Sequence, residues 1–358
     1  MLLVEEGWHS TMYLASGLER AGFAVTVLTA NGSTARCRHR TSDWISGPPV
    51  ASDAFVPSLR GLGPFDHILP LTEAVMARLW DADVAVFPIT QPWQRRLLRD
   101  KHALIEHMAS RGIAVPRQRR LDDELDLDEL GLGDALAIKG STGSAGRMVR
   151  LVETRAALEA AITRARLLGG DWVVQEAIAS PTYLFGGLFD RGQALRIYAA
   201  EKLEQYPPQT GGAIRLRSIH DAALVEAGTR VMRELAWTGF ASADFVRRAD
   251  GTFLLLEVNP RLWGSLAGAM SAGVDLFAPF AQLLGGEPPE PDLAFEADDD
   301  CWIFPRYLNA ARHRTWAGAT QALRDLRGEQ GRDWRDPRFV LHVIRRLRRM
   351  KRLAAPQF

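Results

Sequence analysis

Short apolar runs alternate with helical patterns along the first hundred residues. Apolar runs typical of buried strands lie at residues 2–6, 23–29, 67–71 and 84–89. Helical spacing predicts helices near 13–20, at 72–80 after a Thr72 cap, and at 95–112. Because strands that alternate with helices favour a parallel sheet, we predict an N-terminal α/β domain over residues 1–98.

A hairpin pattern near residue 250 carries the most informative side chains. Asp250 and Gly251 lie between alternating apolar runs, which is a strong signal for a two-residue turn. Such a turn pairs Ala249 with Thr252, Val246 with Leu255, Asp244 with Glu257, and Ser242 with Asn259. Strand side chains alternate between faces, so the oxygen-bearing side chains of these last two pairs are expected on one face.

The two opposed carboxylates predict a cation site. Directly opposed side chains are about 5 Å apart at Cβ, where two like charges repel by about 3 kcal/mol at an effective dielectric of about 20. A hard ion removes this conflict, and Mg²⁺ prefers one or two carboxylates with phosphate oxygens. The alternative is a solvated face with exposed acids, and a one-residue slip would separate Asp244 from Glu257.

A glycine-rich segment over residues 135–153 lies between two strand patterns. Its spacing fits neither a Walker loop nor a dinucleotide fingerprint, because those motifs lead from a strand into a helix. We predict an antiparallel hairpin with Lys139 at its base and a flexible tip over 140–146, followed by a helix from Thr154. The tip could fold over phosphates or be a plain glycine-rich turn.

Composition narrows the class of protein. The 358 residues include 44 basic and 43 acidic side chains, and the net charge of +1 suggests no nucleic-acid partner. Two isolated cysteines give neither a disulfide framework nor a metal cluster, which fits a reducing cytoplasm. The N-terminus lacks the pattern of a signal peptide, and residues 266–284 are expected to form packed helices.

Taken in order, these segments resemble the ATP-grasp superfamily, which includes D-alanine:D-alanine ligases, biotin carboxylases and carbamoyl-phosphate synthetase. The resemblance covers about residues 100–286 and includes the motifs RDKHALIEHMASRGIAVP, WVVQEAI, EKLEQYPPQTGG and NPR. It implies nucleotide contacts from Lys101, Lys139, Ser141, Gly143, Ser144, Gln175, Glu176 and Ile178. It implies metal ligation by Asp244, Glu257 and Asn259, with Arg261 and Lys202 beside the reacting carboxylate.

Single residues of this set also have ordinary interpretations. Lys101 could be an exposed helix cation, Lys202 a strand-edge charge, and Arg261 an ion-pair partner. One position departs from the family, because Thr182 stands where several relatives have a glutamate that binds ribose. A hydroxyl can make one of those hydrogen bonds, at a loss of about 1 to 2 kcal/mol against a charged acceptor.

The resemblance implies an ATP-grasp fold of mixed α/β and α+β class, with an N-terminal parallel-sheet domain and a C-terminal extension. The expected limits are 1–98, then 99–285 with a small subdomain at 99–170 and a large one at 171–285, then 286–358. The implied function is a ligase that uses ATP and Mg²⁺, or Mn²⁺, to join a carboxylate to an amine with release of ADP. A carbamoyl-phosphate-type ATPase and a non-catalytic nucleotide-binding module are the alternatives.

The C-terminal region adds a basic amphipathic pattern over residues 339–353. It fits a docked helix with a solvated basic face, and weak binding to an anionic membrane or an acidic partner is the alternative. A homodimer is compatible with the sequence, which does not specify the oligomeric state or the two substrates.

Overall fold

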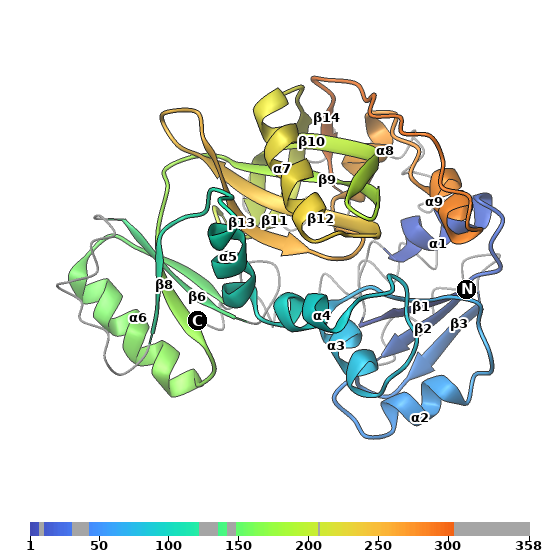
Figure 1. Ribbon diagram of the computed structural model, residues 1–358. Helices are drawn as coiled ribbons and strands as arrows, with labels where there is room; N and C mark the ends of the chain where they lie inside the picture. The colour runs from blue at the N-terminus through green and yellow to red at the C-terminus, as the bar shows by residue number, and fades with distance from the viewer. Residues whose placement is uncertain (7–10, 31–42, 122–134, 142–147, 207, 304–358) are drawn as a thin grey trace, which may run out of the picture.

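Three β-sheets make up the fold in Figure 1, a computed structural model that describes residues 1–358 except 7–10, 31–42, 122–134, 142–147, 207 and 304–358. For residues 12 and 13 the structure describes the backbone alone. The sheets have four, six and four strands. The predicted basic helix at 339–353 lies outside the described residues.

The N-terminal sheet is parallel and has the strand order β3-β2-β1-β4. Its strands are β1 (Leu2–Glu5), β2 (Thr26–Ala30), β3 (Asp43–Gly47) and β4 (Ile68–Pro70). The helices that accompany it are α1 (Thr11–Arg20), α2 (Phe55–Arg60) and α3 (Glu73–Asp81). The predicted parallel sheet is therefore confirmed, and the hydroxyl of Thr72 caps α3 as expected by accepting from the Val75 N–H at 3.2 Å.

Three predictions in the first 112 residues need correction. Residues 84–89 form no strand. The Phe87 N–H donates to the Ile68 carbonyl of β4 at 2.8 Å, but Pro88 has no N–H with which to continue this pairing. Strand β3 and helix α2 were not predicted. The helix expected over 95–112 is two helices, α4 (Pro92–Arg99) and α5 (Lys101–Ser110).

The break between α4 and α5 is made by Asp100. Its backbone is extended, at φ −116° and ψ 105°, and its carboxylate accepts from the N–H groups of His102 at 2.8 Å and Ala103 at 3.2 Å. An aspartate whose side chain accepts from the first amides of a helix is more favourable at the N-cap position than inside a helix. This cap makes Lys101 the first residue of α5.

The small sheet is antiparallel, with the order β5-β8-β6-β7. Its strands are β5 (Gln118–Arg120), β6 (Leu136–Gly140), β7 (Val149–Val152) and β8 (Trp172–Glu176), and α6 (Arg155–Leu168) packs against it. The predicted hairpin is confirmed, since Lys139 pairs with Val149. Strand β8 belongs to this sheet and pairs with β6, although it follows residue 170, the predicted limit of the small subdomain.

The large sheet is antiparallel, with the order β13-β12-β9-β10-β11-β14. Its strands are β9 (Thr182–Asp190), β10 (Gln193–Tyr206), β11 (Gly212–Ser218), β12 (Gly239–Arg247), β13 (Phe253–Asn259) and β14 (Asp300–Trp302). Helices α7 (Ala222–Glu234), α8 (Leu266–Ser271) and α9 (Phe277–Leu284) accompany it. The last two confirm the packed helices expected over 266–284.

The two faces of the large sheet have different partners. Helix α7 covers one face, where its Leu224 packs in the same cluster as Phe185 of β9 (Figure 1). Leu184 lies on the opposite face, in the cluster that contains α8 and α9 residues. Because Leu184 pairs with Asp244, the carboxylate of Asp244 projects from this second face.

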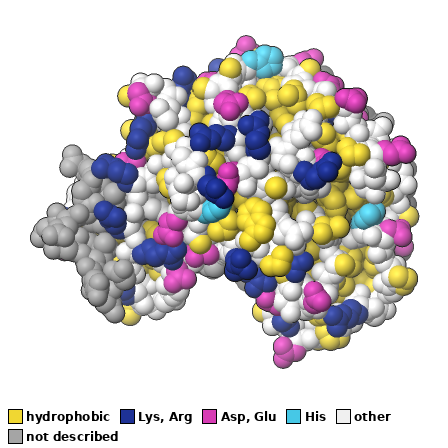
Figure 2. Space-filling view, in the orientation of Figure 1, with side chains coloured by type: hydrophobic (Ala, Val, Ile, Leu, Met, Phe, Trp, Pro, Cys, Tyr) yellow, Lys and Arg dark blue, Asp and Glu magenta, His cyan; other side chains and the backbone are white. Residues whose placement is uncertain are grey.

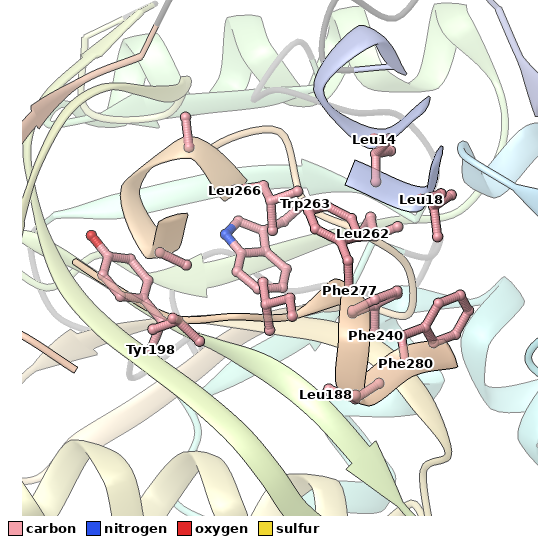
Figure 3. Close-up of a cluster of buried hydrophobic side chains, with 14 of the residues drawn as sticks. Leu14, Leu18, Leu188, Tyr198, Phe240, Leu262, Trp263, Leu266, Phe277 and Phe280 are labelled. Atoms are coloured by element: carbon pink, nitrogen blue, oxygen red, sulfur yellow. The ribbon is translucent and has the colours of Figure 1, made fainter. Parts of the chain in front are cut away.

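The N-terminal sheet docks on the large sheet through α1 and α9. Figure 3 shows Leu14 and Leu18 of α1 beside Phe277, with Phe240 of β12 and Phe280 in the same cluster. Figure 2 shows acidic and basic side chains interspersed over the face in view, in keeping with the near-zero net charge. No helix among the described residues is long and apolar enough to cross a membrane.

Candidate functional site

The β12–β13 hairpin opposes Asp244 to Glu257 and Ser242 to Asn259, as predicted. The route to this register differs from the prediction. Arg248 N–H donates to Thr252 at 2.9 Å, so the turn has three residues and Gly251 takes a φ of +91°. Val246 consequently pairs with Leu254 and not with Leu255, and Ala249 has no place in the ladder.

A bulge at Leu256 restores the predicted register. The ladder shifts by one residue between the Phe245–Leu255 and Asp244–Glu257 pairs. The extra residue re-aims the end of β13, so that Glu257 and Asn259 face the same side as Asp244. The three-residue turn shifts the strand pairing by one residue and the bulge shifts it back, so Asp244 and Glu257 are paired as predicted.

Three lysines from three other elements gather beside these carboxylates, and two of them contact the carboxylates directly. Lys101 of α5 donates to Glu257 Oε2 at 3.0 Å, and Lys202 of β10 donates to Asp244 Oδ2. Lys139 of β6 donates to the backbone carbonyl of Leu256, the bulge residue, at 3.4 Å. The site thus joins the small sheet, the large sheet and α5.

Burial and charge set the ionisation of this group. The positive charge of Lys101 is the largest influence on Glu257 and holds its pKa well below the ordinary range, although burial opposes it. Burial dominates at Asp244 and raises its pKa, against the effect of Lys202. Burial also lowers the pKa of Lys139 to about 8, and Glu257 offsets this only in part. At Lys101, burial would lower the pKa, but Glu257 and Glu73 together leave it raised.

The oxygen donors fit a hard divalent cation. Asp244 Oδ1 and Ser242 Oγ are buried and have no hydrogen-bond partner within the described part of the chain. A buried carboxylate oxygen without a donor is costly, and a bound cation would satisfy it. The Glu257 side chain keeps 31% of its surface exposed, so this acid can still be reached. Among the described residues, no group of three His, Cys, Asp or Glu side chains offers a competing metal site.

Arg261 lies at the end of β13, where the sequence placed it beside the acids. Its Nη2 donates to Asn259 Oδ1 at 3.3 Å and to Glu73 Oε1 at 2.7 Å. Burial tends to raise the pKa of Glu73, but Arg261 and Lys101 leave it below the ordinary value. Arg261 is therefore an ion-pair partner that also contacts a predicted metal ligand, and sequence reasoning missed Glu73.

Lys202 is no strand-edge charge. It lies on an internal strand of the large sheet, and its side chain is 5% exposed. Thr182, which replaces the expected ribose-binding glutamate, is buried on β9 and pairs with Lys202 across the ladder. The hydroxyl of Thr182 is thus on the sheet that carries the acids.

The predicted adenine segment starts at β8. Gln175 Oε1 accepts from Lys139 at 3.3 Å, and its amide donates to Gln118 Oε1 at 3.0 Å. The carboxylate of Glu176 accepts from Arg248 and, at 2.9 Å each, from the backbone N–H and Nε of Arg117. The side chain of Glu176 is therefore engaged in holding β8 to the β12–β13 turn.

The remaining nucleotide-binding predictions fall at the edges of the small sheet. The backbone N–H of Glu176 donates to the Arg117 carbonyl at 2.9 Å and is not available to adenine. Ile178 is half-buried just after β8. Ser141 is buried directly after β6, whereas Gly143 and Ser144 lie outside the described residues.

Comparison with known proteins identifies the domain. The family model of the ATP-grasp domain matches residues 98–265. An L-amino acid ligase from Bacillus licheniformis is 19% identical, with a TM-score of 0.63 over 81% of this chain and 75% of that chain. A biotin carboxylase from Campylobacter jejuni is 14% identical, with a TM-score of 0.65 over 84% of this chain and 74% of its own.

A third similar structure is an N5-carboxyaminoimidazole synthetase from Staphylococcus aureus in complex with ADP. It is 16% identical, with a TM-score of 0.67 over 84% of this chain and 80% of that chain. At these identities the structural matches show a shared fold. No curated protein matches the sequence significantly. Residues 98–265 of this chain form an ATP-grasp domain.

Proposed function

We propose that the protein activates a carboxylate as an acyl phosphate with ATP and joins it to an amine, releasing ADP and phosphate. The observation that supports this most is the opposed pair of Asp244 and Glu257, beside which three lysines from separate elements gather. An arrangement that gathers acids and cations on one face, where the Lys101 and Glu257 side chains stay 25% and 31% exposed, suits a polyanion that arrives with a divalent ion.

In the proposed site, Asp244, Glu257 and Asn259 would hold Mg²⁺ or Mn²⁺. The metal would supply the positive charge that lets phosphate oxygens approach two carboxylates. Lys101, whose side chain is 25% exposed, can then exchange Glu257 for a phosphate oxygen. Lys139 would regain full charge beside phosphate, because an adjacent anion opposes the effect of burial on its pKa.

The chemistry needs no covalent enzyme nucleophile. A substrate carboxylate oxygen attacks the γ-phosphorus of ATP, the bond from that phosphorus to the β–γ bridging oxygen breaks, and ADP leaves. The neutral amine then attacks the acyl carbon, the carbon–oxygen bond to phosphate breaks, and the nitrogen loses a proton. Arg261 and Lys202 contribute fixed positive charge near the acyl phosphate and the oxyanion of the second step.

A carboxyphosphate-forming reaction is the second candidate. The likeness to a biotin carboxylase and to an N5-carboxyaminoimidazole synthetase favours it at the level of fold. In that reaction bicarbonate would replace the organic acid, and the same lysines would neutralise the phosphates. The domain limits, a homodimer and a cytoplasmic location stay predictions.

A substrate screen tests the proposal. Purified protein is incubated with Mg·ATP and panels of carboxylates, amines and bicarbonate, and ADP and new amides are measured by mass spectrometry. The ligase reaction predicts ADP release only with a particular acid and amine, and Glu257→Gln should lose it. ATP binding without turnover against every panel would favour a binding module, and ADP release with bicarbonate alone would favour the second candidate.

A further inference from the structure

A carboxylate from the N-terminal sheet reaches the acids and lysines of the ATP-grasp domain. Glu73 is the first residue of α3, and the Thr72 cap fixes the start of that helix. Thr72 is itself held, because its hydroxyl donates to Glu6 Oε2 at 2.9 Å. From this anchored position Glu73 Oε1 accepts from Arg261 Nη2 at 2.7 Å, across 188 residues of sequence.

The contact continues as a chain of hydrogen bonds to the predicted metal ligands. Arg261 Nη2 donates to Asn259 Oδ1, and Asn259 Nδ2 donates to Glu257 Oε1, each at 3.3 Å. The guanidinium thereby sets which end of the Asn259 amide faces Glu257. Glu73 and Glu257 are the two carboxylate ends of this chain.

Burial makes the partner of Arg261 important. The Arg261 side chain is 12% exposed, and a charge at that depth needs a counter-ion or hydrogen bonds. Arg261 also borders a small pocket between the two sheets, whose other walls are apolar and include Leu71, Phe87 and Phe240. That pocket offers no carboxylate that could take the place of Glu73.

The position of Glu73 is fixed by packing as well. Figure 3 shows α1 of the N-terminal unit against Phe277 of α9. A Cβ at Gly17 of α1 would lie 2.3 Å from the Phe277 ring, so the two helices approach as closely as a glycine allows. The N-terminal sheet therefore presents Glu73 on a rigid support.

We propose that Glu73 is a positioning residue of the ATP-grasp site, which holds the Arg261 guanidinium, and through it Asn259, in the arrangement that turnover requires. This inference rests on the proposed function. It means that the N-terminal unit completes the reactive site and that the ATP-grasp segment alone lacks one of its determinants.

The test compares Glu73→Gln with Glu234→Gln, a matched control away from the site. Glu234 also pairs with an arginine, Arg111 Nε at 2.8 Å, and its side chain is 27% exposed against 28% for Glu73. With the substrates found in the screen, Glu73→Gln should lower kcat by about 10- to 100-fold, because a partner that orients a reactive group has an effect of that size. The KM for Mg·ATP should stay nearly unchanged, and Glu73→Asp should recover part of the loss.

The control separates positioning from stability. Glu73→Gln should lower the melting temperature more than Glu234→Gln, because the Arg261 side chain is 12% exposed and that of Arg111 is 57% exposed. Only Glu73→Gln should lower kcat. Equal kcat in Glu73→Gln and wild type would leave Glu73 with a docking role alone and overturn the inference.

A chemical readout keeps the inference testable if the screen finds no substrates and the proposed function fails. Phenylglyoxal modifies accessible arginines, and peptide mass spectrometry reports the rate at Arg261 in the full-length protein. Glu73→Gln should speed modification of Arg261 several-fold, whereas Glu234→Gln should not change it. An unchanged rate in Glu73→Gln would show that Glu73 does not hold the guanidinium.

Discussion

Replacing Lys202 with methionine should destabilise the protein strongly in the absence of metal. The side chains of Lys202 and Asp244 are 5% and 12% exposed, so the pair is buried. Removal of one partner from a buried pair leaves an uncompensated charge and costs about 3 to 5 kcal/mol, whereas an exposed pair is worth at most about 1 kcal/mol. Lys202→Met should therefore melt roughly 6 to 12 °C lower even at the smaller cost.

Urea unfolding in EDTA measures this loss directly. The matched variant is Lys202→Met with Asp244→Leu, which removes both charges and keeps apolar volume. Replacement of a buried pair by apolar side chains is often neutral, so the double variant should return to within about 1 kcal/mol of wild type. A single variant that loses less than about 1 kcal/mol, or a double variant no more stable than the single, would refute this description of the pair.

Three further predictions concern the elements that support the site. Gly17→Ala should lower stability by about 1 to 3 kcal/mol in thermal unfolding, because the clash with Phe277 outweighs the gain of about 1 kcal/mol in helix propensity. A more stable variant would contradict the close approach of α1 and α9. Asp100→Ala should cost about 0.5 to 2 kcal/mol in urea unfolding through loss of the α5 cap, and unchanged stability would mean that the cap contributes nothing. Glu176→Gln should lower the free energy of unfolding by about 1 to 3 kcal/mol, because its hydrogen bonds to two arginines would no longer be between charged groups. Urea unfolding curves with the same midpoint and slope for the variant and wild type would contradict this prediction.

The hairpin shows what alternation along a sequence can and cannot establish. The pairing of Asp244 with Glu257 was predicted from a two-residue turn, yet the turn has three residues and Leu256 bulges. Three successive leucines at 254–256 are all apolar, so no polar position marks where the period of two is interrupted. The acids came out correctly because the two deviations cancel.

Helix ends were predictable where the sequence has a side chain typical of an N-cap. Thr72 was predicted as a cap and Thr154 as the start of a helix, and each accepts a hydrogen bond from an N–H three residues later. Asp100 carries the same signal, but the apolar residues on both sides continue a helical spacing, which favoured one long helix. The cap was decisive because its carboxylate satisfies two amides of α5.

Ion pairs between segments that are distant in the chain could not be predicted from the local sequence. Glu73 meets Arg261 because the N-terminal sheet packs on the large sheet, whereas in the sequence a glutamate at a helix start is an ordinary first-turn acid. The same holds for Glu176, whose two arginine partners lie 59 and 72 residues away. Such pairs depend on how the sheets pack, which a single sequence does not encode in any spacing.

Calorimetric titration of ADP tests the central claim most directly, which is that Asp244, Glu257 and Asn259 form the metal part of a nucleotide site. Wild type should bind ADP more tightly with Mg²⁺ than in EDTA, and Glu257→Gln should lose most of that gain, by about 10-fold or more. Binding of ADP in EDTA should survive in the variant, since the lysines remain. A Glu257→Gln protein that keeps the full Mg²⁺ enhancement would contradict the account.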